Sequence, residues 1–180
     1  SGGTVYVGCA DHYVYALDAV SGEEIWRFGT GGKVDSSPVE VEGSVYVGGL
    51  DHSVYAIDAA TGGERWRFET GGRVRSSPEV WGGMVYVGGF DTHLYAIDAA
   101  TGQEKWRFKT GSRVDSSPVV AVETLYVGSF DHNVYAIDTD TGDEKWSFET
   151  GGEILCSPAA SGDSVYISSS DGYLYALDAR

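Results

Sequence analysis

Histidine and aspartate are the residues of this 180-residue chain whose side chains could bind a metal or transfer protons. The histidines follow a repeat, because three share one slot and the fourth comes one position later in its own unit: His12, His52, His132 and His93. Metal ligands must lie within a few ångströms of each other, whereas repeated positions belong to separate structural units. We therefore interpret Asp-His pairs such as Asp51-His52 as turns.

A second set of aspartates repeats just as faithfully: Asp18, Asp58, Asp98 and Asp138. Asp58 precedes Thr61-Gly62 and can accept hydrogen bonds that close this loop. A catalytic centre should break the repeat in one unit, and the sequence contains no such insert, no glycine-rich phosphate loop and no clustered Cys and His ligands. The sequence predicts no enzyme activity, no cofactor and no metal site.

These residues belong to a 40-residue unit that continues without insertion or deletion. A Val-Tyr-Val-Gly motif starts at Val5, Val45 and Val85, and variants of it start at Leu125 and Val165. Four units add a glycine and then a tryptophan: Gly22, Gly62, Gly102 and Gly142, with Trp26, Trp66, Trp106 and Trp146. The four prolines all occupy one slot of the unit: Pro38, Pro78, Pro118 and Pro158.

One unit predicts four short strands and no helix: 37–41, 44–49, 53–58 and 64–69. Two-residue turns at Glu42-Gly43 and Asp51-His52 join the first three strands. The second and third strands are apolar on both faces, so each sheet needs a neighbouring sheet on either side. This pattern predicts an all-β propeller of four-stranded antiparallel blades, about 4.5 repeats in five sectors, with a β-solenoid as the alternative.

We expect a single domain over residues 1–180, and the strand count leaves the first and last sectors incomplete. The first sector lacks its inner strand and the last lacks its outer strand. The corresponding repeats are 1–33, 34–73, 74–113, 114–153 and 154–180.

The motif Tyr-Ala-(Leu/Ile)-Asp-x-x-Thr-Gly-x-x-x-Trp, exemplified by Thr61, Gly62 and Trp66, resembles the PQQ-like, or tryptophan-docking, propeller repeat. That repeat occurs in quinoprotein dehydrogenases, in the outer-membrane β-barrel assembly lipoprotein and in kinase-linked sensor domains. The resemblance implies that each tryptophan docks between its own blade and the next. It says little about activity, because one fold hosts many functions.

The quinoprotein enzymes of this family close about eight blades around their cofactor and carry inserted loops with a calcium site. Many also carry a disulfide between adjacent cysteines. This sequence has no Cys-Cys pair, no insertion and roughly half the length. A fragment of a PQQ-dependent oxidoreductase is therefore kept as an alternative function only.

Family propellers often end on the third strand of a blade and borrow the fourth from the N-terminus. By that analogy the end of this chain looks natural and its start truncated, and unpaired strand edges favour oligomerisation or edge pairing. Cys9 and Cys156 would face each other if the last inner strand docked on the first sector. We therefore consider them a closure pair, disulfide-bonded if the domain is exported, while two small buried thiols are the favoured alternative.

The composition of the chain excludes some classes of binding partner. A formal net charge of −15 repels phosphate backbones, which argues against nucleic acid. The chain has no apolar run long enough for a membrane span. The acidic, lysine-poor composition fits a halophile protein or an exported domain, with an ordinary acidic surface as the alternative, and of the cellular locations it favours an extracytoplasmic one, exported or ectodomain.

Function should concentrate where the copies differ, and the clearest departures are Arg75, Trp81, Leu155-Cys156 and Ser168-Ser169-Ser170. We expect Trp81 and Arg75 to be candidates for a contact surface. The sequence favours a non-catalytic scaffold or sensor domain, part of a larger protein, that binds a protein or peptide or associates with itself. An amplified or engineered repeat array without a ligand is the remaining alternative.

Overall fold

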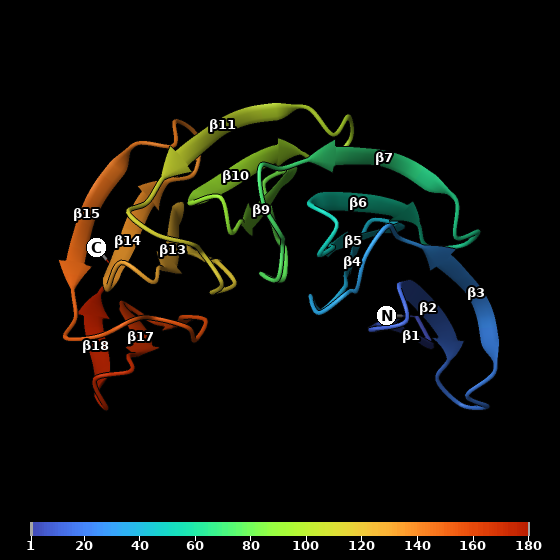
Figure 1. Ribbon diagram of the computed structural model, residues 1–180, viewed down its shortest axis with the longest axis horizontal. Coiled ribbons are helices and arrows are strands. Elements are labelled where there is room, and N and C mark those ends of the chain that lie inside the picture. The colour runs from blue at the N-terminus through green and yellow to red at the C-terminus, as the bar shows by residue number, and fades with distance from the viewer. Residues whose placement is uncertain (1, 180) are drawn as a thin grey trace.

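The computed structural model describes residues 2–179, which form five antiparallel sheets arranged as blades along an open arc (Figure 1). Three four-stranded sheets lie between two three-stranded sheets, and no helix occurs in the described part of the chain. This confirms the all-β propeller fold and the order of complete and incomplete blades expected from the repeat. Figure 1 shows β3, β7, β11 and β15 along the outer rim of the arc.

The strands of each blade are consecutive in the sequence. Blade 1 contains β1 (Thr4–Gly8), β2 (Tyr13–Asp18) and β3 (Glu24–Gly29). Blade 2 contains β4 (Val39–Val41), β5 (Ser44–Gly48), β6 (Ser53–Asp58) and β7 (Glu64–Glu69). Blade 3 contains β8 (Glu79–Trp81), β9 (Met84–Gly88), β10 (His93–Asp98) and β11 (Glu104–Lys109). Blade 4 contains β12 (Val119–Ala121), β13 (Thr124–Gly128), β14 (Asn133–Asp138) and β15 (Glu144–Glu149). Blade 5 contains β16 (Ala159–Ser161), β17 (Ser164–Ser168) and β18 (Leu174–Asp178).

The strand limits differ slightly from those expected. The inner strand begins at Val39 and not at Ser37, because the Ser37 amide donates to Ser77 Oγ of the next blade, 2.8 Å away, and Pro38 has no amide proton. The same amide-to-hydroxyl bond recurs from Ser77 to Ser117 and from Ser117 to Ser157. The inner ends of neighbouring blades are therefore tied together.

The turns also show one correction. The turn between β4 and β5 has two residues, and both Glu42 and Gly43 have positive φ angles, as in a type I′ hairpin. The connection between β5 and β6 is longer than the expected two residues and spans 49–52. The Asp51 carboxylate explains the extra length, because it caps the loop by accepting from the Ser53 amide at 3.3 Å.

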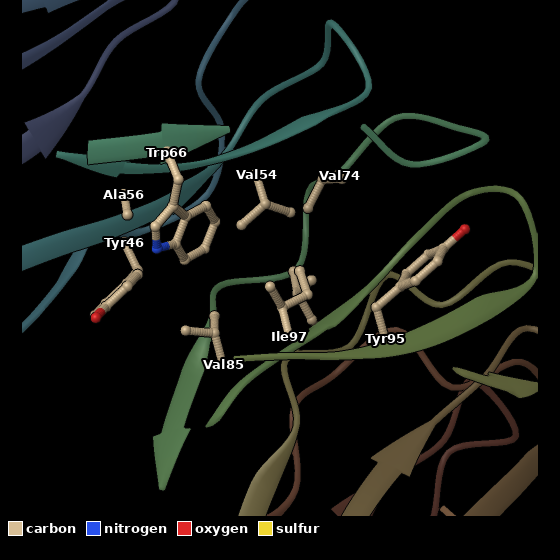
Figure 2. Packing of buried hydrophobic residues seen from close by; sticks show 9 residues of the cluster. Tyr46, Val54, Ala56, Trp66, Val74, Val85, Tyr95 and Ile97 are labelled. Carbon is tan, nitrogen blue, oxygen red and sulfur yellow. The ribbon is translucent and has the colours of Figure 1, made fainter. Parts of the chain in front are cut away.

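The hydrophobic core lies between blades. Figure 2 shows one such layer, in which Trp66 and Val54 of blade 2 face Val85 and Ile97 of blade 3. Val74, from the segment that links the two blades, fills the same layer and is fully buried. Every residue of β5 is buried, which is the two-sided burial that its apolar pattern predicts.

Blades 1 and 5 have a neighbour on one side only. Val5 and Val7 of β1 are 45% and 41% exposed, whereas Val45 and Val47, their equivalents in β5, are fully buried. In blade 5, Leu174 is 71% exposed. An apolar face is therefore open at each end of the arc. Within residues 2–179 no helix is long and apolar enough to cross a membrane.

Candidate functional site

The repeated tryptophans tie each blade to the next one. The indole Nε1 of three of them donates to a carbonyl oxygen 33 residues later: Trp26 to Ala59 at 2.9 Å, Trp66 to Ala99 at 2.9 Å and Trp106 to Thr139 at 3.0 Å. The glycines of the repeat leave room for these rings, because a Cβ at Gly102 would lie 2.8 Å from the Trp66 ring. These contacts are structural.

The two end members of this series differ. Nothing lies within 4 Å of a Cβ built on Gly22 in blade 1. Trp146 of blade 4 lines a cavity of about 310 Å³ together with Phe148, Leu177 and Asp178. Trp146 is thus less enclosed than Trp26 or Trp66.

The second set of aspartates closes the loop between the third and fourth strands. Asp58 Oδ1 accepts from the Thr61 amide and hydroxyl, both at 2.9 Å. A β-bulge between Ala56 and Ile57 accompanies the turn of Arg65 toward this loop, and Arg65 Nη2 donates to Asp58 Oδ2 at 2.7 Å. The Arg65 hydrogen bond, helped by Thr61, lowers the pKa of Asp58 to about 2. Asp18, Asp98 and Asp138 accept from the equivalent loops of their own blades.

The Asp-His pairs lie in the turns between the second and third strands. Asp51 Oδ2 accepts from the Gly31 amide of the preceding blade at 2.6 Å and from the Tyr55 hydroxyl. His52 has a φ of 70°, and its carbonyl oxygen accepts from Thr70 of its own blade. The pair therefore holds the turn in place, both against the preceding blade and within its own blade. Nowhere in residues 2–179 do three His, Cys, Asp or Glu side chains gather as metal ligands would.

Cys9 and Cys156 are both free thiols. They belong to blades 1 and 5, which lie at opposite ends of the arc in Figure 1. The alternative of two buried thiols is wrong, since Cys156 is exposed and Cys9 is only partly buried. The physical reason is the open arc, because each thiol lies in an end blade that has one neighbour.

The departures from the repeat lie in two blades, 3 and 5. Arg75 and Trp81 lie on one segment, the inner strand β8 and the chain leading into it. Glu79, which we did not single out from the sequence, lies between them in a slot that holds an apolar residue in the complete neighbouring blades, Val39 and Val119. Comparing that slot across the repeats is the signal that could have found it. The other departures lie in blade 5, where Leu155 is 50% exposed and Ser169 Oγ donates to the Gly152 carbonyl at 3.1 Å.

Arg75 bridges three blades. Its guanidinium lies 3.5 Å from Asp35 Oδ2 in the chain leading to blade 2 and 3.2 Å from Asp115 Oδ2 in the chain leading to blade 4. The three residues occupy the same slot of consecutive repeats. Arg75 is therefore already paired on both sides, and its role in the structure is to join the inner ends of the blades.

Glu79 is a half-buried carboxylate on β8. Its Oε1 accepts from the Val120 amide of β12 at 3.5 Å, so this face of β8 is directed toward blade 4. Burial raises the pKa of Glu79 above its ordinary value. Trp81 is two residues further along the same strand and thus on the same face, and it is 38% exposed.

The hairpin that follows Trp81 is bare. Gly82 and Gly83 have φ angles of 59° and 76°, and no atom lies within 4 Å of a Cβ built on either residue. The Gly83 carbonyl is held by the Ala99 amide at 2.9 Å, so the hairpin is fixed against the loop after β10. The equivalent turns of blades 2 and 4 carry side chains at Glu42 and at Val122-Glu123.

Three cavities surround this bare hairpin. The largest, of about 460 Å³, lies between blades 2 and 3. Its lining residues include Glu42, Tyr46, Arg65, Gly82, Met84 and Asp98. A cavity of about 150 Å³ shares Glu42 and Tyr46 with it and adds Trp81. On the other side of the hairpin, a cavity of about 230 Å³ is lined by Gly82, Met84, Lys105, Trp106, Thr139 and Asp140. We call Trp81, Gly82, Gly83 and these three cavities the blade-3 hairpin site.

Comparisons with known proteins agree with this geometry. The crystal structure of BamB from Moraxella catarrhalis superposes with a TM-score of 0.87 at 22% identity, covering 99% of this chain and 58% of that one. The computationally designed Ika8 protein superposes with a TM-score of 0.89 at 17% identity, covering 98% of this chain and 55% of that one. The chain thus spans a little more than half the length of these two proteins.

One curated enzyme shares a short segment. The 1-butanol dehydrogenase (quinone) of Thauera butanivorans is 48% identical over 42 residues, which cover 23% of this chain and 7% of that enzyme. Relatives of this chain therefore include an enzyme. The family model described as outer membrane protein assembly factor BamB matches residues 10–129 and 93–180. The chain belongs to this BamB-type family of PQQ-like β-propeller repeat proteins.

Proposed function

We propose that this chain is a non-catalytic propeller scaffold, part of a longer protein, that binds a protein or peptide at the blade-3 hairpin site. The observation that carries the proposal is the coincidence of Trp81, Gly82 and Gly83 with three cavities in an otherwise regular repeat. The largest cavity places charged groups, Glu42, Arg65 and Asp98, beside the aromatic ring of Tyr46, and concave sites that combine apolar walls with a few polar groups are typical of binding sites. An exposed tryptophan is also the residue type most enriched among residues that dominate binding energy.

The positions of aspartate and histidine, two residue types that often act in catalysis, also support the proposal. The repeated aspartates and histidines of the described chain are engaged in turns and in contacts between blades, such as Asp51 with Gly31 and Asp58 with Arg65. The family description, an assembly factor, also favours a scaffold.

An unbiased peptide display library, selected on the purified chain, tests the proposal. We expect selected peptides to lose at least tenfold in affinity for Trp81→Ala, because truncating an interface tryptophan commonly costs about 2 kcal/mol or more. The matched control is Val122→Ala, since Val122 is 75% exposed in the equivalent turn of blade 4. Peptides that bind both variants as tightly as the parent chain would place the binding surface elsewhere. Enrichment of no peptide would favour a repeat array without a ligand.

A second candidate function, a fragment of a quinoprotein oxidoreductase, is favoured by the segment shared with the butanol dehydrogenase. PQQ is a tricarboxylate quinone, so a site for it needs free cations and, for calcium, clustered oxygen ligands. The described residues do not supply the clustered calcium ligands, and the cation that departs from the repeat is not free. Arg75 is already paired with Asp35 and Asp115, and residues 2–179 bring no three metal-ligating side chains together. A saturable absorbance change on titration with PQQ and calcium would restore this candidate.

Self-association is a further candidate, favoured by the open apolar faces of blades 1 and 5. Val5, Val7 and Leu174 are the exposed residues that carry it. Sedimentation at increasing protein concentration should show dimers or larger species, and Leu174→Glu should weaken them. A monomer at all concentrations would contradict self-association and leave the scaffold proposal intact.

A further inference from the structure

Resting on the proposed function, we infer that the blade-3 hairpin site takes a peptide that carries a lysine or arginine next to an apolar residue, with the cationic group bound by Glu42. The site thus has a preference by charge, and a binding partner is recognised through a basic, partly apolar segment. Three features support this preference: the charges of the largest cavity, its apolar surface and the glycine backbone of the hairpin.

Of the charged groups that line the largest cavity, the Glu42 carboxylate has no partner of opposite charge among residues 2–179. Arg65 is compensated by Asp58 at 2.7 Å, and Asp98 by Lys105 of the same blade at 3.4 Å. Glu42 is exposed, and no cation within residues 2–179 pairs with it. The cavity is therefore net negative, in a chain whose formal net charge is −15. A cationic ligand is drawn to such a site, and an anionic one is repelled.

The walls of the cavity suit a side chain with an apolar stem. Tyr46 and Ala99 supply apolar surface in the cavity that Glu42 also lines. Lysine and arginine bury their aliphatic stems along such surface while the charged end reaches a polar partner. The volume of about 460 Å³ lies within the ordinary range for ligand pockets, so the neighbouring residue of a peptide can enter as well.

Trp81 and the bare hairpin extend the site. The smaller cavity, which Trp81 lines, shares Glu42 and Tyr46 with the larger one. An arginine or lysine held by Glu42 therefore lies beside the ring of Tyr46, and the rest of the peptide can continue along the Trp81 segment. Because Gly82 and Gly83 have no side chains, the backbone of a peptide can approach this hairpin more closely than the equivalent turns.

Fluorescein-labelled pentapeptides test the inference by fluorescence polarisation. The probes are Gly-Arg-Leu-Arg-Gly and its counterpart with glutamate in place of both arginines. We expect the arginine peptide to bind, more weakly as salt is added, and the glutamate peptide to bind at least tenfold more weakly. Glu42→Gln should weaken the arginine peptide on the order of tenfold, because it removes a charge-assisted hydrogen bond.

Glu123→Gln is the matched control. Glu123 is exposed in the equivalent turn of blade 4 and has a similar backbone, with φ angles of 58° and 51° for Glu123 and Glu42. Both variants change the net charge equally, so a purely global attraction would affect them alike. Unchanged thermal melts will show that both variants are folded.

The outcomes separate the inference from the proposed function. Equal binding of the two pentapeptides, or equal loss in Glu42→Gln and Glu123→Gln, overturns the cationic preference. Library peptides that lose affinity for Trp81→Ala but are acidic or neutral would also overturn the cationic preference. In that case the scaffold proposal would still stand. If neither the arginine peptide nor any library peptide depends on Trp81, both proposals fail.

Discussion

The indole Nε1 of Trp66 and the hydroxyl of Tyr46 donate to one acceptor, the carbonyl oxygen of Ala99 in the next blade, at 2.9 and 3.2 Å. Two residues of blade 2 are thus fastened to a single atom of blade 3. The same pairing joins Tyr6 and Trp26 to Ala59.

Trp66→Phe should destabilise the chain by about 1–3 kcal/mol, since it removes one hydrogen bond and part of a buried ring. Ala99 keeps Tyr46 as a donor, so no buried carbonyl is left without a partner. The midpoint of urea unfolding measures the effect. Trp81→Phe is the control and should stay within about 0.5 kcal/mol, because Trp81 is partly exposed. Equal shifts for both variants would contradict the interblade role of Trp66.

Gly102→Ala and Gly22→Ala separate backbone strain from ring contact. The two glycines have φ angles of 72° and 75°, so alanine at either costs about 1–2 kcal/mol. Only Gly102 has a ring above it, with the Trp66 ring 2.8 Å from the new Cβ. We expect Gly102→Ala to cost about 1–3 kcal/mol more than Gly22→Ala in the same unfolding experiment. Indistinguishable losses would show that the ring contact contributes nothing.

The pKa of Asp58, lowered to about 2 chiefly by the Arg65 hydrogen bond, predicts an acid-dependent contribution to stability. A carboxyl group whose pKa is lower in the folded state stabilises the fold above its unfolded pKa, near 3.8, and loses that effect as the pH falls through 2. Carboxyl NMR shifts followed against pH measure the Asp58 pKa directly. Arg65→Gln should move it up toward 3.8, and an unchanged pKa would contradict the assigned cause.

Tyr86 predicts the opposite dependence at alkaline pH. Burial raises its pKa to about 12, so its contribution is complete below pH 10 and is lost as the pH rises through 12. The ultraviolet absorbance of tyrosinate should therefore show a late step in the titration of the 12 tyrosines. Tyr86→Phe should reduce the amplitude of that step. Tyr95, whose pKa is also raised to about 12, and Tyr135, whose pKa burial raises as well, should keep the remainder.

The fold was predictable because the 40-residue unit displays its strands and turns several times. The apolar residues on both faces of β5 and β6 and the turn at Glu42-Gly43 contain enough local information to place each blade. The start of β4 was not predictable, since it depends on Ser77 in a neighbouring blade. Contacts between units are not encoded within one unit.

The candidate site was predictable only in part. Trp81 and Arg75 stand out as departures from the repeat, but the pairing of Arg75 with Asp35 and Asp115 depends on how consecutive inner strands lie side by side. The cavities arise because the turn at Gly82-Gly83 meets the loop after β10 and the edge of blade 2, and a linear pattern does not give that meeting point. Arg65 faces Asp58 through a bulge that shifts the strand register by one residue, which alternation alone would place wrongly.

The constant spacing of the interblade contacts has a consequence for how such a gene can change. The tryptophan indole donates to a carbonyl oxygen 33 residues later, and the serine amide donates to a serine hydroxyl 40 residues later. The glycine amide donates to an aspartate carboxylate 20 residues later. Excising or duplicating any stretch of one full period between complete blades therefore joins a donor to an equivalent acceptor. Recombination between misaligned repeats can lengthen or shorten this protein by a blade without creating a foreign junction, while the hairpin of blade 3 can diverge alone.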